Sequence, residues 1–224
     1  MPLIRQRYRV GRPKQKEQPS TVQEDAKKKL ISTAARELFF ERGYDTTSMD
    51  EVARHAGVSK ATVYAHFESK ENLLLQLIHD EVEAMPIVPQ DGPVRTMEEL
   101  RAALRSYAEQ FALMFQNQQT VALHRLVIAQ AHMFEGIGKA FYEAVPQAME
   151  REVSRVLRAG VDSGILQIAD LDVAASQFLS LVVGILPLRA VLSSKPPSME
   201  VWTKTVESGL AIFLAAYACH ARKA

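Results

Sequence analysis

The sequence is poor in cysteine and lacks the short motifs that mark common enzyme classes. Its 224 residues include one cysteine, Cys219, so no disulfide can form within the chain, as expected in a reducing compartment. A glycine-rich phosphate loop, a Gly-x-Ser-x-Gly elbow, a His-Glu-x-x-His pair and a cysteine metal cluster are all missing. We therefore predict no catalytic residue and no cofactor.

Patterns typical of metal sites, membrane spans and secretion signals are also missing. His124 and His132 are eight positions apart, which does not give the i, i+4 pair of a helical metal site. The longest apolar run, residues 178–188, is much shorter than the ~20 residues that span a bilayer. Residues 1–25 are polar and basic and lack the apolar core of a secretion signal. We expect a cytoplasmic protein with no metal site and no membrane partner.

The positive charge is concentrated at the start of the chain. The net charge is +1, yet residues 1–30 carry nine Lys or Arg and only three acidic residues. Arg9 and Arg12 lie in an arm whose Gly11 and Pro13 disfavour a helix. This arm resembles an AT-hook and would suit a narrow minor groove of DNA. The alternative is a disordered tail that increases solubility.

Residues 47–67 have the pattern of two short helices joined by a tight turn. Hydroxyl and acidic residues precede and open the first helix, residues 49–56, where they cap the helix and complement its dipole. Gly57 follows, where the chain must reverse in a left-handed conformation. Ser59 then caps a second helix, residues 59–66. This arrangement predicts a helix-turn-helix, a motif that binds DNA.

The second helix has one apolar edge and one edge suited to DNA. Val58, Val63 and Phe67 form the apolar edge at helical spacing. The remaining side chains are short or polar and suit a major groove and its phosphates: Lys60, Ala61, Thr62, Tyr64, Ala65 and His66. An ordinary solvent-exposed helix is the alternative, because such helix pairs occur in many bundles. Amphipathic helices predicted over residues 26–44 and 71–85 would support the motif.

Residues 29–77 resemble the N-terminal domain of the TetR family of bacterial transcriptional regulators. The similarity lies in Ala34, Ala35, Leu38, Phe39, Gly43, Tyr44, Thr46, Thr47, Val52, Ala53, Ala56, Gly57, Val58, Ser59, Thr62, Tyr64, Phe67, Lys70 and Leu73. Met49 departs from the isoleucine or valine usual in the family, but it fills the same apolar position.

The TetR resemblance implies which residues bind double-stranded DNA. The second helix would enter the major groove, Tyr64 and His66 would lie near phosphates, and Lys70 and Thr47 would each add a phosphate contact. With the basic arm, the candidate DNA-binding residues are Thr47, Ser59, Lys60, Ala61, Thr62, Tyr64, His66, Lys70, Arg9 and Arg12.

The sequence predicts an all-α protein with an N-terminal DNA-binding domain and a larger C-terminal helical domain. We expect a basic arm over 1–24, the DNA-binding domain over 25–70, a connecting helix over 71–85, a linker over 86–96 and the C-terminal domain over 97–224. Helical periodicity predicts C-terminal helices over residues 97–116, 119–133, 137–163 with an interruption at Pro146, 171–192 and 198–220.

Residues 123–142 and 178–192 are similar to the C-terminal domain of AefR-like TetR regulators. The resemblance implies a pocket for a small-molecule effector in each C-terminal domain. Aromatic and methionine side chains are the candidates, because they adapt to apolar ligands. They are Tyr107, Phe111, Met114, Phe115, His124, Met133, Phe141, Tyr142, Met149 and Phe178. The alternative for each is simple core packing.

The last two predicted helices carry enough apolar residues to suggest a homodimer. The helix over 171–192 is apolar on several faces and is expected to be buried nearly all round, whereas the last helix contains small residues that allow close packing. Both helices could instead be monomer core, but the resemblance favours an intermolecular four-helix bundle. The candidate interface residues are Phe178, Leu181, Val182, Ile185, Trp202, Val206, Leu210, Phe213, Leu214 and Tyr217.

Three functional hypotheses follow. The leading hypothesis is a repressor that binds a palindromic operator as a homodimer and is released by a small hydrophobic effector. A two-fold dimer would place its recognition helices ~34 to 36 Å apart, or a multiple of that distance. The second hypothesis is a DNA-binding protein of the same fold that acts without an effector. The third, an enzyme, is disfavoured by the missing motifs.

Overall fold

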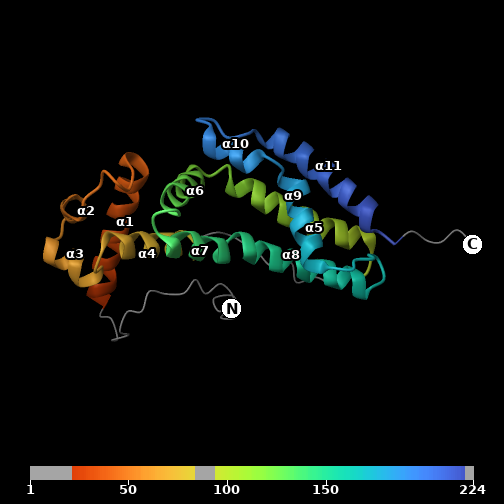
Figure 1. The fold of residues 1–224 in the computed structure, drawn as a ribbon, viewed down its shortest axis with the longest axis horizontal. Helices are drawn as coiled ribbons and strands as arrows, with labels where there is room; N and C mark the ends of the chain where they lie inside the picture. Colours follow the sequence, from red (N-terminus) through yellow and green to blue (C-terminus); the bar gives the residue numbers. More distant parts are fainter. Residues whose placement is uncertain (1–21, 84–93, 220–224) are drawn as a thin grey trace, which may run out of the picture. The chain divides into compact units, whose positions relative to one another are not determined.

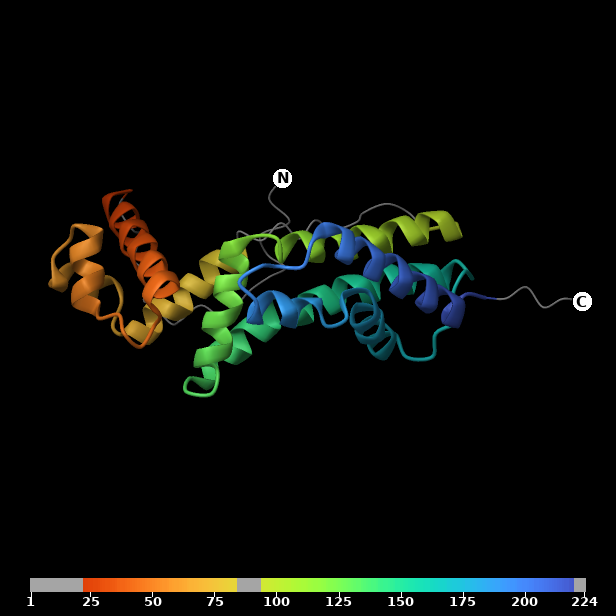
Figure 2. The ribbon, with the colours of Figure 1, turned by 90° about the horizontal axis from the view of Figure 1, so that it is seen from above.

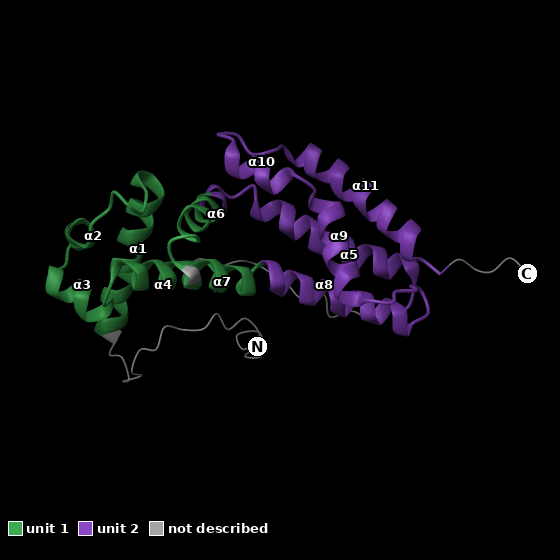
Figure 3. Cartoon of the chain, in the orientation of Figure 1, with its two compact units in different colours: residues 1–85, 122–145 green, residues 86–121, 146–224 purple. Residues whose placement is uncertain are grey.

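The computed structural model describes residues 22–83 and 94–219. Regular secondary structure in these residues is helical, apart from one isolated bridge between Leu166 and Ala218 (Figure 1). The helices form two compact units, which Figure 3 colours separately. The predicted all-α fold is confirmed.

The first unit contains the predicted DNA-binding domain and a segment from much later in the chain. Its helices are α1 (Val22–Arg42), α2 (Met49–Ala56), α3 (Lys60–His66), α4 (Lys70–Glu83), most of α6 (Gln118–Gln130) and α7 (Glu135–Ala144). Each of the first four helices contributes fully buried apolar side chains, among them Ile31, Ala35, Val52, Val63, Leu73 and Leu74. α1 packs on α2 and α4, and α2 packs on α3.

Residues 122–145 pack with this unit, although the sequence pattern placed them in the C-terminal domain. The physical reason is a set of tertiary contacts, since α7 packs on α4. The segment between α6 and α7 also contacts the turn that precedes α2, where Phe134 packs against Tyr44. Contacts between distant segments, rather than the order of the chain, define this unit.

The second unit is a helical bundle with its own core. It contains α5 (Met97–Met114), α8 (Pro146–Asp162), α9 (Leu171–Val183), α10 (Leu186–Leu192) and α11 (Met199–Tyr217). Figure 2 shows α11 running beside α5, and α9 packs on α8, α5 and α11. The core includes Leu100, Leu104, Tyr107, Val153, Leu157, Phe178, Val182, Leu210 and Phe213.

The prediction of one continuous helix over residues 171–192 is wrong. The chain breaks at Gly184, whose φ of 51° lies in the region that favours glycine, and α10 then begins with Pro187 in its first turn. Val173, Ile185 and Leu192 are 50%, 63% and 78% exposed in the single chain, so the predicted burial on all sides is not reached within one monomer. Each of these helices therefore has an outer face that the described part of its own unit leaves uncovered.

α9 and α11 approach each other closely at Gly209. A Cβ atom at this position would overlap with the carbonyl group of Leu181 and the backbone nitrogen of Val182. The prediction that small residues in the last helix permit close packing is confirmed, but the partner helix belongs to the same chain. The α9–α11 contact is thus part of the monomer core.

Candidate DNA-binding surface

α2 begins with a capping box, in which the side chains of Ser48 and Glu51 each accept a hydrogen bond from the other residue's backbone amide. The Ser48 amide donates to Glu51 Oε2 at 2.8 Å, and the Glu51 amide donates to Ser48 Oγ at 3.2 Å. The first of these hydrogen bonds is the main cause that lowers the pKa of Glu51 below its usual value. The predicted capped start of the first helix is confirmed.

The turn between α2 and α3 is also formed as the sequence predicts. Gly57 has a φ of 67° and caps the end of α2, and the Val58 amide donates to the Ala53 carbonyl oxygen at 3.0 Å. Ser59 Oγ then accepts a hydrogen bond from the Thr62 amide at 3.1 Å and lies 2.8 Å from Thr62 Oγ1. The side chains of Ser59 and Thr62 are therefore engaged in starting α3.

α3 divides into a buried edge and an exposed edge. Val63 and Phe67, the residue that caps the end of the helix, are 0% and 1% exposed and anchor it to the unit. Lys60, Ala61 and Ala65 are exposed and Tyr64 is 44% exposed, whereas Thr62 and His66 are half-buried. Four of the six predicted outward side chains, at positions 60, 61, 64 and 65, therefore lie on one accessible face, which is what reading a DNA groove requires.

The Lys60 ammonium pairs with Asp50 at the start of α2. Its Nζ lies 2.8 Å from Asp50 Oδ1 and 5.9 Å from the centre of the Tyr64 ring. The hydrogen bond from Lys60 to this carboxylate is the main cause that raises the pKa of Lys60. Both partners are about 60% exposed, so the pair is weak and a phosphate can replace the carboxylate.

Lys70 begins α4 and packs on the turn after α1. Its Nζ lies 4.1 Å from the centre of the Tyr44 ring and 3.5 Å from the Asp45 carbonyl oxygen. Partial burial lowers the pKa of Lys70, against the opposing effects of Asp45 and Glu51. Lys70 is thus held in a defined place beside the helix-turn-helix.

Thr47 does not lie on the surface, where the resemblance placed it. It is 2% exposed, and its hydroxyl donates to the Gly43 carbonyl oxygen at 2.9 Å while its amide donates to the Tyr44 carbonyl oxygen at 3.1 Å. These bonds hold the turn before α2. The structure therefore gives Thr47 a role in the turn, and Ser48 alone caps α2. Arg9 and Arg12 lie outside the described residues.

The predicted effector-binding residues are divided between the two units. His124, Met133, Phe141 and Tyr142 belong to the first unit, and Tyr107, Phe111, Met114, Phe115, Met149 and Phe178 belong to the second. Met133 and Tyr142 are 66% and 51% exposed, whereas Tyr107, Phe115 and Phe178 are buried. The Tyr107 hydroxyl donates to the buried carboxylate of Glu152 at 3.2 Å. The structure therefore does not bring all of these side chains into one unit.

Most of the predicted dimer-interface residues are buried inside the second unit. Phe178, Val182, Trp202, Val206, Leu210, Phe213 and Leu214 are 0–5% exposed. They pack between helices of the same chain, and Phe178 meets Phe213 edge to face at 5.3 Å. Their assignment to an interface was wrong, because apolar helix faces look alike in sequence whether a neighbouring helix or a second subunit covers them.

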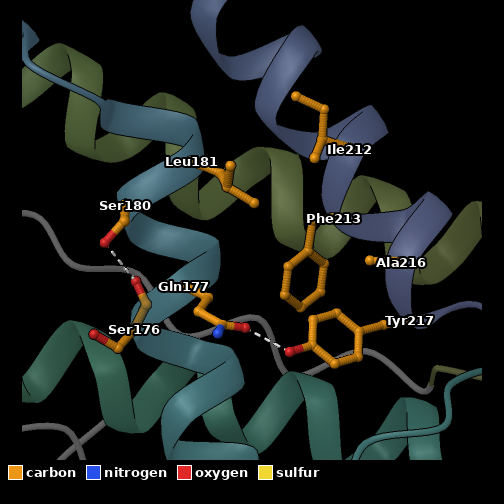
Figure 4. A pocket seen from close by; sticks show the side chains of 8 residues that line it. All are labelled: Ser176, Gln177, Ser180, Leu181, Ile212, Phe213, Ala216 and Tyr217. Atoms are coloured by element: carbon orange, nitrogen blue, oxygen red, sulfur yellow. Dashed lines mark hydrogen bonds between the residues drawn. The ribbon is translucent and has the colours of Figure 1, made fainter.

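A groove lies between the outer sides of α9 and α11. It has a volume of about 410 Å³ and is lined by Ser176, Gln177, Ser180, Leu181, Ile212, Phe213, Ala216 and Tyr217 (Figure 4). The Tyr217 hydroxyl donates to Gln177 Oε1 across it. Leu181, Phe213 and Tyr217 are predicted interface residues, and none of the predicted effector-binding residues lines this groove.

The contacts around Tyr44 could not be predicted from the sequence. Tyr44 and Lys70 stand out in the sequence only as part of the TetR pattern, and Asp45, Gln130 and Phe134 carry no signal of a shared role. Gln130 and Asp45 are hydrogen-bonded across 85 positions of the chain. No local pattern could have paired them.

The described residues also bear on two other kinds of site. In residues 22–83 and 94–219, no three His, Cys, Asp or Glu side chains are placed to hold a metal ion. No individual helix in these ranges is long and apolar enough to cross a membrane, although α9 and α10, bent by 55°, reach that length and composition together.

Comparisons with known proteins agree with the geometry of this surface. Residues 31–77 match the model of the bacterial regulatory proteins of the TetR family, and residues 102–219 match the C-terminal domain of AefR-like transcriptional repressors. The chain belongs to the TetR family. It is therefore a DNA-binding transcriptional regulator rather than an enzyme, as the sequence predicted.

Individual relatives of this TetR-family chain show how far the similarity extends. The structure of the flavonoid-responsive regulator FrrA is 38% identical, with a TM-score of 0.73 over 88% of this chain and 100% of that one. The regulator YhgD of Bacillus subtilis is 27% identical over 71% of this chain and 82% of its own length. The activator FasR of Mycolicibacterium smegmatis is 37% identical, but the match spans only 39% of each protein.

Proposed function

We propose that this TetR-family protein is a repressor that binds a palindromic operator as a homodimer in the cytoplasm and is released by a small hydrophobic effector. The exposed face of α3 is the observation that carries this proposal. Lys60, Ala61 and Tyr64 stand there on a short helix that is capped at its start and anchored by Val63. Short and polar side chains on a rigid helix are suited to reading base edges.

Several residues around α3 are proposed to contact the DNA backbone. Tyr64 and His66 lie at the later part of the helix, and Lys60 can exchange its exposed partner Asp50 for a phosphate. Lys70 adds a positive charge from the start of α4. Phosphate contacts of this kind fix the helix on the duplex, whereas contacts to base edges provide specificity.

The proposed dimer interface is the outer face of α9 and α11. The groove between these helices is lined partly by apolar side chains, and Ile212 at its edge is 54% exposed. We expect Ile212→Asp to convert the dimer to a monomer, because the interface would then have to bury a charge. Thr203→Asp, at another exposed position of α11, is the matched control and should leave the dimer intact. Analytical ultracentrifugation separates these outcomes, and a wild-type monomer would refute the proposal.

A buried donor that is unpartnered in the described part of the chain, within an aromatic cluster of the second unit, supports a small hydrophobic effector that carries a hydrogen-bond acceptor. Phe111, Phe115 and Trp202 pack together, with the rings of Phe115 and Trp202 stacked at 6.0 Å. Trp202 Nε1 is buried and makes no hydrogen bond within the described residues, so it could donate to an acceptor on a ligand. The name of FrrA points to flavonoids, which are flat aromatic molecules with oxygen acceptors.

Release from DNA would follow from a shift between two conformations. The effector must bind the conformation with low operator affinity more tightly, because equal affinity for both would change nothing. α4 is proposed to carry the change, since it begins at Lys70 and packs on α1 and α7.

The decisive experiment selects genomic DNA fragments with the purified protein and then adds flavonoids. We expect one palindromic sequence to be enriched and its affinity to fall when the effector is present. Transcription from the recovered promoter should rise when the gene for this protein is deleted, whereas a fall would indicate an activator like FasR. Failure to enrich any sequence would refute the proposal that the protein binds a specific operator.

A second candidate is a regulator of the same fold that acts without an effector. It is favoured by the burial of Tyr107, Phe115 and Phe178, which are at most 1% exposed and packed like ordinary core residues. Operator affinity that stays unchanged with every flavonoid tested, together with no change in thermal stability, would favour this candidate over the first.

A further inference from the structure

The segment between α6 and α7 contacts the turn that precedes the helix-turn-helix. We call Gln130 to Phe134 the α6–α7 corner. Gln130 is 4% exposed, and its Nε2 donates to Asp45 Oδ2 at 3.4 Å. The Phe134 ring meets the Tyr44 ring edge to face, with centres 5.7 Å apart and an angle of 77°. Both contacts lie within the first unit.

The same two turn residues also hold Lys70. The Lys70 ammonium lies over the Tyr44 ring at 4.1 Å and 3.5 Å from the Asp45 carbonyl oxygen. Tyr44 is 7% exposed, and its ring is also held by the ring of Phe39, with centres 5.3 Å apart and an angle of 63°. Tyr44 and Asp45 therefore connect the α6–α7 corner to Lys70 through direct contacts.

The geometry gives these contacts a mechanical consequence. A cation over an aromatic face is attracted only while the ring presents that face, and two edge contacts restrict how the Tyr44 ring can turn. If Phe134 moves away, the ring gains freedom, and the ammonium loses a fixed position. The Gln130 contact restrains the backbone turn in the same way, because it holds the side chain of Asp45.

We propose that the α6–α7 corner positions Lys70 for a DNA phosphate through Tyr44 and Asp45, so that movement of the corner weakens DNA binding. This inference rests on the proposed phosphate contact of Lys70. Tyr44, Asp45, Gln130 and Phe134 are positioning residues and do not themselves touch DNA. The corner thereby becomes a place where events elsewhere in the chain can change operator affinity.

A double-mutant cycle on the full chain tests this proposal. Binding to a short duplex pool of mixed sequence is measured by fluorescence anisotropy over a range of salt concentrations for Lys70→Ala, Phe134→Ala and the double variant. Lys70→Ala should lower the affinity about tenfold and reduce the salt slope by about 0.9 for each phosphate that the variant no longer neutralises. In the wild-type background, Phe134→Ala should lower the affinity and reduce the salt slope, each by less than Lys70→Ala does. In the Lys70→Ala background, Phe134→Ala should cause no further change in either quantity.

Matched variants separate positioning from general damage to the fold. Ile128→Ala removes an exposed apolar side chain from the same helix end and should change neither affinity nor salt slope. Tyr44→Phe keeps the ring and should bind like the wild type, whereas Tyr44→Leu should reproduce Phe134→Ala. Thermal melting checks that each protein is folded, and Gln130→Ala, with an expected loss of a few fold, tests the same connection if Phe134→Ala is unfolded.

The possible failures are distinct. Additive effects of Phe134→Ala and Lys70→Ala, or an unchanged salt slope in Phe134→Ala, would overturn the positioning role. If Lys70→Ala binds the duplex pool with the affinity and salt slope of the wild type, Lys70 makes no phosphate contact, and the basis of the inference is lost. A wild-type protein that binds no duplex even at low salt would instead contradict DNA binding itself.

Discussion

The helix-turn-helix and the α9–α11 pair are both made of short or medium helices, but different interactions define them. α2 and α3 each begin with a serine whose hydroxyl accepts a backbone hydrogen bond, and Gly57 forms the turn between them. Ser198, the residue before α11, makes no such bond, and the position of α11 is fixed by close packing on α9. Local signals therefore determine the first region, and contacts between distant segments determine the second.

The largest effect should come from adding one methyl group to the α9–α11 contact. Gly209→Ala places a Cβ against the backbone of Leu181 and Val182, neither of which can move aside as a side chain can. We expect a loss of about 3 kcal/mol in the free energy of unfolding. Urea denaturation measures it.

Gly136→Ala in α7 is the control for this substitution. A Cβ at Gly136 would meet no atom within 4 Å, so the alanine should stabilise the helix by up to about 1 kcal/mol. Equal stability changes at the two glycines would show that α9 and α11 are not held by their close approach.

The next effect concerns the exposed face of α3 and is seen in binding instead of stability. Tyr64→Ala should weaken binding to the selected operator by ~1 to 3 kcal/mol, the range for a well-placed hydrogen bond to a charged group. Because Tyr64 is 44% exposed, the unfolding midpoint should hardly change. Tyr64→Phe removes only the hydroxyl and so distinguishes its contribution to binding from that of the ring. Undiminished operator affinity in Tyr64→Ala would refute the proposed docking of α3 on DNA.

A smaller effect distinguishes the two kinds of helix start. Ser48→Ala removes the cap of α2 and should cost about 1 kcal/mol of stability. Ser198→Ala, at the start of α11, should change stability by less than about 0.5 kcal/mol, because its side chain caps nothing. Chemical denaturation of both variants tests the comparison, which fails if the two losses are the same.

The last effect is a dependence of stability on alkaline pH. Burial is the main cause that raises the pKa of Tyr44 to about 12, with smaller contributions from Glu71 and Asp45. The neutral phenol is therefore favoured in the folded state, and its contribution is complete below pH 10 and is lost as the pH rises toward 12. Tyr44→Phe should reduce the fall in stability over that window. An identical fall in both proteins would remove Tyr44 as its source.

The helix-turn-helix could be predicted from the sequence because its signals are close together. Ser48, Gly57 and Ser59 act on backbone groups within a few positions, and the alternation of Val63 and Phe67 with exposed residues follows helical periodicity. Thr47 was the exception. Its hydroxyl belongs to the same class as that of Ser48, and only the folded turn reveals that it is buried against Gly43.

The second unit was harder to predict because apolar patterns do not identify what covers them. Phe178 and Phe213 look like interface residues in sequence but pack on each other in one chain. The break at Gly184 was missed because the apolar pattern continues through it, although Gly184 and Pro187 are residue types that interrupt helices. The placement of residues 122–145 depends on contacts such as Gln130 with Asp45, which no local pattern encodes.

The self-contained caps of α2 and α3 have a practical consequence for protein engineering. Because Ser48, Gly57 and Ser59 build the turn without help from Lys60, Ala61 or Tyr64, the latter three can be exchanged while the scaffold stays intact. A library randomised at these exposed positions would retain its folding signals. α3 can thus serve as a replaceable segment for directing a regulator of this kind to promoters chosen by design.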